Sequence, residues 1–441
     1  MNDTIAAVAS PLAEGAISII KISGCQAVEK INKIFDRNLE NFGANTINYG
    51  NIVDPTSNQI IDEVMISIFK NPNSFTREDV VEINTHGGVL VTRTVLSLVL
   101  AQGIRLARPG EFTQRAFLNG RVDLTQAEAI NDLVIASSTK GMELAVSGIK
   151  GSIKKLLDPL ISDMLDIIAQ IEVNIDYPEY DDVKQLTNDL VKPNVNDWLN
   201  RLNIIIEKAL KTREIKEGVR TVIIGEPNVG KSSLFNALIE EDKAIVTDIA
   251  GTTRDLVEGS IHLDNVTLSL IDTAGLRDTE DKIEKIGIEK TNEAITKAEF
   301  VILVLDASRN INKRELSLLE KIKDKRHLVV YNKSDLKAQG SLQVSAIEND
   351  IEALVSEINN LFEYADLDLS EGSLNNERQI GLAMQARNGL NQALLAIDNQ
   401  LELDLVTIDL NESYMALKEI LGEVSRDDLL DTLFSKFCLG K

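Results

Sequence analysis

A glycine-rich loop between a β-branched run and a helix-forming run constrains the fold of this chain more than any other feature. Residues 221–233 have the sequence TVIIGEPNVGKSS, in which Gly225, Gly230, Lys231 and Ser232 keep the spacing of a P-loop. In that motif, backbone N–H groups surround phosphates, the lysine contacts the outer phosphates and the hydroxyl reaches Mg²⁺. The loop therefore predicts a strand–loop–helix unit of a parallel α/β sheet that binds a nucleoside triphosphate.

Three later segments indicate that the base of this nucleotide is guanine. Residues 272–275, DTAG, follow an apolar run, where a carboxylate can reach Mg²⁺ and the glycine can approach the γ-phosphate. Residues 332–335, NKSD, follow another apolar run. The Asp335 carboxylate can accept hydrogen bonds from N1–H and N2–H₂ of guanine, a donor pair that adenine lacks. Ser345 and Ala346 fit the short loop behind the base, so the four segments together predict a GTP site.

The group that activates water is not evident from these motifs. Between the P-loop and Asp272, the sequence IVTDIAGTTRD places Thr253 where it can close over Mg²⁺ and the γ-phosphate as a switch. In Ras-type GTPases a glutamine after the DxxG glycine orients the attacking water, and here that position is Leu276. Either a partner assists hydrolysis or another group acts in cis. The charged candidates downstream are Arg277, Glu280, Asp281, Glu284 and Glu289.

Length and composition predict a multidomain protein of the cytoplasm. The chain has 441 residues, of which 44% are hydrophobic and 26% charged, enough for two or three domains. No apolar run approaches the roughly 18–20 residues of a membrane span, and the first residues lack the basic region of a signal peptide. Two cysteines, Cys25 and Cys438, are too few for a disulfide framework. We therefore expect no membrane association.

The net charge of −23 limits how the chain can bind nucleic acid. An acidic surface disfavours non-specific binding to phosphate backbones. Any nucleic-acid partner would then be bound through a local patch or with the help of another protein.

Periodicity divides the chain into three parts. Residues 1–118 alternate β-branched runs with turns and one helical stretch, which predicts an α+β domain. Residues 119–215 and 376–441 have apolar residues at helical spacing and predict one discontinuous all-α domain. Residues 216–375 alternate strands and helices and predict a Ras-like P-loop α/β domain inserted into it.

The chain ends with the sequence FCLGK, which allows three interpretations. A lipidation box at Cys438 is disfavoured, because Gly440 occupies an aliphatic position and Lys441 is not a usual final residue. The cysteine can instead supply a thiol to a reaction site, or be an apolar residue that closes the last helix. Free cysteines are often buried, so the residues alone favour packing, but both interpretations stay open.

At this point the chain resembles the MnmE (also called TrmE) family of tRNA modification GTPases. Four stretches carry the resemblance: PNVGKSSLFNAL with AIVTDIAGTTRD, DTAGLR with EKIGIEK, ARPGEFTQRAFLNGRVDLTQAEAI at Ala107–Ile130, and the final FCLGK. The likeness extends over essentially the whole chain and includes the inserted-domain layout. GTPase motifs alone fit many GTPases, whereas the PGEFTQRAFLNG block and FCLGK are far more specific.

The resemblance implies a GTPase that is activated by K⁺ and whose nucleotide domains pair. It implies that Asn228, Thr247 and Ile249 hold K⁺, that Ser232 and Thr253 hold Mg²⁺, and that Glu284 is catalytic. The predicted GTP-binding residues are then Asn228, Val229, Gly230, Lys231, Ser232, Ser233, Thr247, Asp248, Ile249, Ala250, Gly251, Thr252, Thr253, Asp272, Thr273, Ala274, Gly275, Asn332, Lys333, Asp335, Ser345 and Ala346.

For the N-terminal domain, the resemblance implies folate binding and constitutive homodimerisation. Lys21, Glu82, Arg121 and Lys441 match the family's contacts to 5-formyl- or 5,10-methylene-tetrahydrofolate, and Cys438 matches its cysteine. Lys21 stands where the family has arginine, and the two cations are not interchangeable in geometry.

The resemblance also implies a reaction and a partner. With an FAD-dependent protein of the MnmG (GidA) type, such a GTPase adds an aminomethyl or carboxymethylaminomethyl group to C5 of the wobble uridine, U34, of certain tRNAs. The alternative is a regulatory GTPase switch, for example in ribosome assembly, in which the N-terminal domain serves only dimerisation.

Overall fold

The computed structural model describes residues 3–136, 139–176, 186–240, 257–263, 266–271, 292–337, 340–362 and 372–424, and beyond these residues 430, 433–435, 437 and 440. The chain divides into two compact units. The first comprises Met1–Ile135, Leu144–Asn200 and Gly381–Lys441, and the second comprises Ala136–Glu143 and Arg201–Ile380. The domain boundaries drawn from periodicity remain predictions.

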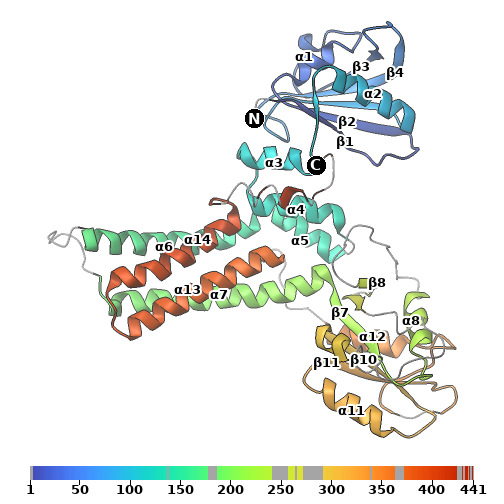
Figure 1. Ribbon diagram of the computed structural model, residues 1–441, viewed down its shortest axis with the longest axis vertical. Helices are drawn as coiled ribbons and strands as arrows, with labels where there is room; N and C mark the ends of the chain where they lie inside the picture. Colours follow the sequence, from blue (N-terminus) through green and yellow to red (C-terminus); the bar gives the residue numbers. More distant parts are fainter. Residues whose placement is uncertain are drawn as a thin grey trace. The chain divides into compact units, whose positions relative to one another are not determined.

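A six-stranded sheet in the order β3-β4-β5-β2-β1-β6 forms one end of the first unit (Figure 1). Neighbouring strands are antiparallel, except that β1 and β6 are parallel. Its elements are β1 (Ile5–Val8), β2 (Ile17–Ser23), α1 (Ala27–Asn32), η1 (Leu39–Asn41), β3 (Thr46–Val53), β4 (Ile60–Phe69), β5 (Val80–His86), α2 (Val89–Ala101) and β6 (Arg105–Leu106). Helices α1 and α2 cover one face, where Ile20, Ile22 and Ile83 meet Val95 and Val99.

The opposite face of this sheet carries the polar positions of the same strands. Because side chains alternate along a strand, the neighbours of Ile20, Ile22 and Ile83 point the other way. Lys21 pairs with Ala7 on one side and with Glu82 on the other. Ala7 packs with Phe112 of α3 (Glu111–Leu118), which lies on this second face. The face is therefore part apolar and part charged.

The helices of the discontinuous helical part show the expected helical spacing of apolar residues. They are α4 (Leu124–Ile135), α5 (Thr139–Ile149), α6 (Ser152–Asp176), α7 (Asn188–Glu217), α13 (Glu377–Asp398) and α14 (Leu403–Leu421). On α6 the buried residues include Leu157, Leu160, Met164, Ile168 and Ile171, three or four positions apart. They face α14, which packs along α6 (Figure 1).

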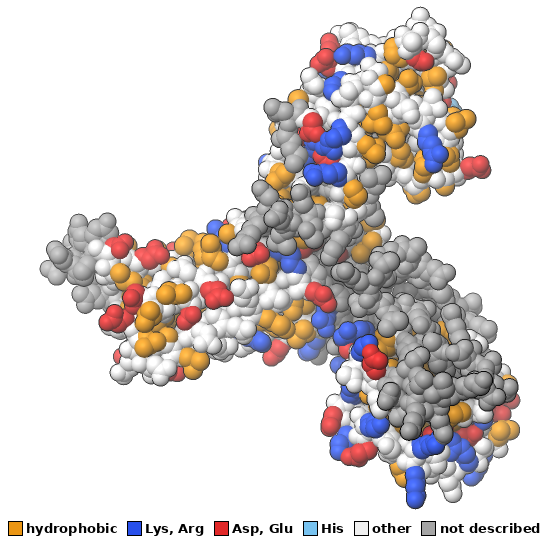
Figure 2. Space-filling view, in the orientation of Figure 1, with side chains coloured by type: hydrophobic (Ala, Val, Ile, Leu, Met, Phe, Trp, Pro, Cys, Tyr) orange, Lys and Arg blue, Asp and Glu red, His pale blue; other side chains and the backbone are white. Residues whose placement is uncertain are grey.

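Charged side chains of both signs are visible on the surface of these helices (Figure 2). Within the described part of the chain, no helix is both long enough and apolar enough to span a membrane.

The second unit contains a sheet in the order β12-β11-β10-β7-β9-β8. Only the β8–β9 pair is antiparallel. Its elements are β7 (Val219–Ile224), α8 (Lys231–Glu240), β8 (Val257–His262), β9 (Thr267–Ile271), β10 (Phe300–Asp306), α11 (Lys313–Ile322), β11 (Arg326–Asn332), β12 (Gln343–Val344) and α12 (Glu352–Leu361).

Both faces of this sheet are buried under separate apolar clusters, as parallel sheets require. On one face Ile302 and Val304 pack with Leu234 of α8 and Leu354 of α12. On the other, Leu303 packs with residues that include Ile322 of α11. The predicted fold class is confirmed: an N-terminal α+β part, a discontinuous helical part and a P-loop α/β part.

Candidate functional site

The P-loop joins β7 to α8, and its backbone has the conformations that a phosphate cradle needs. Gly230 has φ +95°, and a Cβ atom there would lie 2.1 Å from the side-chain nitrogen of Asn332. Asn228 also has a left-handed backbone, with φ +62°. A non-glycine residue with positive φ is uncommon and costs energy, which the surrounding loop must offset. The chain therefore holds this loop in a shape whose N–H groups converge near the start of α8.

Lys231 lies at the first position of α8 and reaches back across the loop. Its ammonium donates to the carbonyl oxygens of Gly225, at 3.0 Å, and Glu226, at 2.9 Å. Burial lowers the pKa of Lys231, and the nearby Glu226 carboxylate opposes that shift. Both hydrogen-bond acceptors are neutral carbonyls, so a bound phosphate would offset the ammonium charge better than they do.

Asn332 connects the phosphate loop to the segment expected behind the base. Its side-chain amide donates to the Val229 carbonyl at 2.9 Å and accepts from the Ala346 N–H at 3.1 Å. Only 3% of Asn332 is exposed, so both bonds are protected from water. The Ser345 hydroxyl donates to the Asp335 carboxylate at 3.0 Å and so orients it. The structure thus brings together the predicted residues of the P-loop, the NKSD segment and the SA segment.

Asp306, which the sequence analysis did not single out, belongs to the same edge of the sheet. It is the last residue of β10, and its carboxylate accepts a hydrogen bond of 2.6 Å from the Lys333 ammonium. Burial alone would raise the pKa of Asp306, but the hydrogen bonds from Lys333 and Ser308 outweigh it and bring the pKa to about 2. The signal was present in the sequence, because FVILVLD is an apolar strand that ends in a carboxylate.

Several predicted residues lie outside the described part of the chain. They are Thr247, Asp248, Ile249, Ala250, Gly251, Thr252, Thr253, Asp272, Thr273, Ala274, Gly275, Glu284, Cys438 and Lys441. The predicted roles of these residues in binding Mg²⁺, K⁺, water and folate therefore stay predictions.

A second group of predicted residues meets on the sheet of the first unit, around two aromatic rings. The Lys21 ammonium lies 4.4 Å from the centre of the Phe75 ring and 5.1 Å from that of Phe112. The Arg121 guanidinium lies 4.8 Å from the centre of the Phe75 ring. Glu82 is the cross-strand partner of Lys21. Lys21, Glu82 and Arg121 therefore belong to one surface, and Phe75 and Phe112 are members that sequence reasoning missed.

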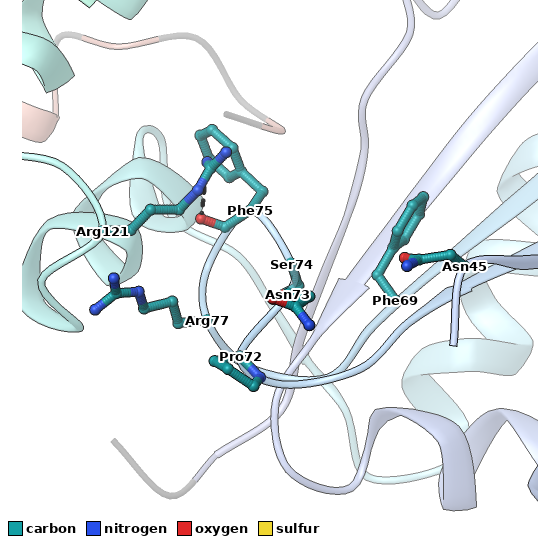
Figure 3. Close-up of a pocket in the computed structure, with 8 residues that line it drawn as sticks. All are labelled: Asn45, Phe69, Pro72, Asn73, Ser74, Phe75, Arg77 and Arg121. Carbon is teal, nitrogen blue, oxygen red and sulfur yellow. Dashed lines mark hydrogen bonds between the residues drawn. The ribbon is translucent and has the colours of Figure 1, made fainter. Parts of the chain in front are cut away.

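A pocket of about 500 Å³ opens beside Phe75 (Figure 3). Its lining combines two arginines, two asparagines and two phenylalanines. The residues are Asn45, Phe69, Pro72, Asn73, Ser74, Phe75, Arg77 and Arg121. Volumes of roughly 300–1,000 Å³ are typical of sites for small molecules. Arg121 thus contacts Phe75 and lines the pocket at the same time.

The loop between β4 and β5, which carries Phe75, is fixed from several sides. The hydroxyls of Ser23 and Thr76 are hydrogen-bonded at 2.7 Å. The Asn119 side chain donates to the Thr76 carbonyl at 2.7 Å, and Arg121 donates to the Phe75 carbonyl at 3.2 Å. These bonds fix the backbone of the loop at Phe75 and Thr76.

A buried ionic network lies beneath this loop. Arg115 is 1% exposed and contacts Glu78 at 3.1 Å, Asp3 at 2.9 Å and Glu111 at 3.2 Å. Arg105 contacts Glu111 at 2.6 Å. Burial tends to raise the pKa of Glu111, but its bonds to Arg105, to the Arg108 backbone and to Arg115 lower it below the ordinary value. The network anchors α3, which carries Phe112, to the loop that carries Phe75.

Two described residues of the final FCLGK segment lie in the first unit. Phe437 is 8% exposed and packs in a cluster with Leu124 and Phe434. Gly440 has φ +89°, and a Cβ there would lie 2.8 Å from the Val8 carbonyl oxygen, at the end of β1. The segment therefore returns to the strand that pairs with β2, on which Lys21 lies.

Comparisons with known proteins agree over nearly the whole chain. The model of the MnmE helical domain matches residues 124–438, and that of the GTP-binding protein TrmE N-terminus matches residues 4–121. A protein from Acholeplasma laidlawii named tRNA modification GTPase MnmE is 47% identical over 99% of this chain and 99% of its own. Proteins of the same name from Bacillus cytotoxicus and Streptococcus agalactiae are each 44% identical over all of this chain, and over 99% and 98% of their own.

Proposed function

The chain belongs to the MnmE family of tRNA modification GTPases, and we propose that its GTP hydrolysis depends on K⁺ and drives modification of the wobble uridine. It acts in the cytoplasm as a homodimer with an FAD-dependent partner of the MnmG (GidA) type. The product carries an aminomethyl or carboxymethylaminomethyl group at C5 of U34, built with a one-carbon unit from tetrahydrofolate. Near-complete coverage by relatives named tRNA modification GTPase supports the proposal.

In this proposal the phosphates of GTP lie in the P-loop. The loop N–H groups and Lys231 bind the β- and γ-phosphates, for which the left-handed backbone of Asn228 and Gly230 prepares the space. Ser232 and Thr253 would hold Mg²⁺, which supplies positive charge to the phosphate oxygens when bound. The side chains of Lys231 and Asn332 hold the loop through hydrogen bonds to its carbonyl groups.

Guanine is selected at the far end of the same edge. Asp335 accepts from N1–H and N2–H₂ of the base, and the Ser345 hydroxyl keeps its carboxylate in the required orientation. Asn332 joins this end to the phosphate end through Val229 and Ala346. The buried Asn332 amide therefore links the position of the segment that binds the base to that of the loop that binds the phosphates.

Hydrolysis uses groups other than the Ras-type glutamine. Leu276 occupies that position and cannot orient water, so we assign the role to Glu284. Asn228, Thr247 and Ile249 would hold K⁺ close to the phosphates, where a cation offsets the charge that develops in the transition state. The exposed, left-handed Asn228 at the tip of the loop supports this assignment.

The N-terminal cluster is the proposed folate site. Glu82 suits the hydrogen-bond donors of a pterin, and Lys21 and Arg121 suit its anionic groups. The return of Gly440 to β1 supports a role for Cys438 and Lys441 at the same place. A nearby cation would favour the thiolate of Cys438.

The K⁺ assignment is tested by steady-state GTPase rates in buffers that contain either KCl or NaCl at equal ionic strength. We expect hydrolysis to be at least about tenfold faster in K⁺, and Asn228→Ala to remove the difference, because one cation ligand contributes on the order of 1.4 kcal/mol to the barrier. Equal rates of the unaltered protein in the two salts would contradict the assignment.

The modification reaction is tested by mass spectrometry of nucleosides from cells that carry Cys438→Ser. We expect the modified wobble uridine to be lost while GTPase activity of the purified variant is retained. Normal modification in cells that lack the whole protein would contradict the proposed reaction and favour the regulatory-switch alternative.

A further inference from the structure

We propose that the pocket between Arg77 and Arg121 binds the glutamate tail of the folate, and that the protein prefers folates with an oligo-γ-glutamyl tail. This inference rests on the proposed folate function and adds to it a ligand class and a residue, Arg77, that neither the motifs nor the resemblance assigned.

The chemical groups along this surface follow an order that a folate can match. Glu82 and Lys21 are cross-strand partners. The Lys21 ammonium and the Arg121 guanidinium both lie against the Phe75 ring, and Arg121 lines the pocket together with Arg77. The order of groups is a carboxylate with a neighbouring ammonium, an aromatic ring and then two guanidinium groups. A folate presents, in the same order, a pterin with N–H donors, an aminobenzoyl ring and carboxylates.

Arg77 lies in an unfavourable backbone conformation. Its φ is +55°, a left-handed conformation that glycine adopts readily and that a long side chain adopts rarely. One of its N–H groups offsets part of this strain by donating to the Asn119 carbonyl, and its other N–H donors can serve a ligand. Retained strain of this kind is found most often where a side chain serves a ligand.

Hydrogen bonds to neutral carbonyl groups hold both arginines in place. One Arg77 nitrogen donates to the Asn119 carbonyl at 3.0 Å, and one Arg121 nitrogen donates to the Phe75 carbonyl at 3.2 Å. Among the described residues that line the pocket, none carries a carboxylate (Figure 3). Each guanidinium has five N–H donors in a planar fork that matches a carboxylate. The pocket is thus a local cationic site on a chain with a net charge of −23.

Carboxylates fit this pocket better than the phosphates of RNA. Asn45 and Asn73 add amide groups to the lining, which suit the amide links of a γ-glutamyl chain as well as its carboxylates. The pocket also continues directly from Phe75, and therefore from the proposed folate residues.

The experiment compares 5-formyltetrahydrofolate carrying one glutamate with the same compound carrying three. Dissociation constants are measured by calorimetry on the full-length protein. We expect the triglutamate to bind about tenfold more tightly, because its additional carboxylates form charge-assisted hydrogen bonds with the two guanidinium groups that are partly screened at this exposed site. In Arg77→Gln, we expect the advantage of the triglutamate to fall below about threefold, whereas Arg77→Lys keeps part of it.

Two further variants separate binding from folding. Arg77→Gly removes the charge and the backbone strain together, so we expect the same loss of tail preference with an unchanged or higher Tm. Arg93→Gln is the matched control, since Arg93 is an exposed arginine on α2, which covers the opposite face of the sheet. It should leave both dissociation constants unchanged.

Each of the remaining outcomes would contradict the proposed tail site. If the unaltered protein binds both folates equally, or if Arg77→Gln keeps the tail preference, the tail site is wrong and the folate site stands. If neither folate binds, both the proposed folate function and this inference fail. If Arg77→Gln weakens binding of an anticodon stem-loop RNA and leaves the tail preference intact, the pocket contacts RNA phosphate and the inference is overturned.

Discussion

The nucleotide site and the N-terminal cluster are built in opposite ways. In the nucleotide site the functional groups come from loops at the carboxyl edge of a parallel sheet, and the neutral, buried amide of Asn332 joins the phosphate segment to the base segment. In the N-terminal cluster they come from β2, β5, the loop before β5, α3 and the residues after α3, and a buried ionic network holds them. Both sites join residues more than a hundred positions apart, but the first does so through a neutral amide and the second through buried charges such as Arg115. The N-terminal cluster should therefore be far more sensitive to loss of a single charge.

The largest effect is expected from Arg115→Met. Arg115 is almost fully buried, so its removal leaves Glu111 and Glu78 with fewer compensating cations. Breaking a buried ion pair from one side costs about 3–5 kcal/mol. We expect hydrogen exchange of β2 and β5 to speed up accordingly and folate binding to be lost, while GDP affinity is unchanged.

Arg93→Met serves as the control for Arg115→Met, because it removes an exposed arginine of α2, on the opposite face of the same sheet. The opening free energies derived from its hydrogen-exchange rates should match those of the unaltered protein within about 0.5 kcal/mol. If Arg115→Met behaved in the same way, the buried network would not be what holds the cluster.

The next largest effect concerns the choice of base. In Asp335→Asn, one carboxylate acceptor becomes an amide donor, which suits the C2 carbonyl of xanthine and opposes the N2–H₂ group of guanine. We expect GTP to bind the variant at least about a hundredfold more weakly than it binds the unaltered protein, and XTP to bind the variant more tightly. An unpaired polar group at the base costs roughly 1–3 kcal/mol, both when the variant binds GTP and when the unaltered protein binds XTP. Competition against a fluorescent GDP analogue measures both. Unchanged preference for GTP would exclude Asp335 from base recognition.

These two predictions also separate the site residues that can be identified from the sequence from those that cannot. The P-loop, NKSD and SA segments could be recognised in the sequence, because each depends on a few consecutive residues after a strand, but the contacts that Asn332 makes between them could not. Lys21, Glu82 and Arg121 were assigned only through the resemblance to a family. Their meeting at Phe75 depends on strand register and on Arg115, a residue whose charge would ordinarily suggest exposure. Asp306 lies between these cases, since the end of its strand was visible in the sequence but its pairing with Lys333 was not.

A smaller effect is expected from Asp306→Asn. Lys333 stands two positions before Asp335, and Asp306 holds its ammonium at 2.6 Å, away from the carboxylate that guanine needs. Without Asp306, Lys333 can compete with the base for Asp335. We expect GTP and GDP to bind about three- to tenfold more weakly, from a loss of about 0.5–1.5 kcal/mol, and ITP, which lacks N2–H₂, to be affected less.

A matched control for Asp306→Asn lies just before the other end of the same strand. Glu299 immediately precedes β10 and pairs with Arg220 at 2.9 Å, whereas Asp306 ends β10. Glu299→Gln therefore removes an ion pair from the opposite edge of the sheet and should leave nucleotide affinity unchanged. Equal losses for GTP, GDP and ITP in Asp306→Asn would reduce Asp306 to a structural role.

The smallest effect concerns pH. Near neutrality, the contribution of Asp306 to GDP affinity should not depend on pH. The pKa of Asp306 is about 2, below the ordinary value of 3.8, so its carboxylate is ionised in both the folded and the unfolded chain above about pH 5. The stabilisation that the Lys333 pair provides is complete there and is lost only as the pH falls from about 4 through 2. We therefore expect the ratio of GDP affinities between the unaltered protein and Asp306→Asn to stay constant from pH 5 to 8. A ratio that changed within that range would mean that a different titrating group controls Lys333, and the nucleotide site would then share the charge sensitivity of the N-terminal cluster.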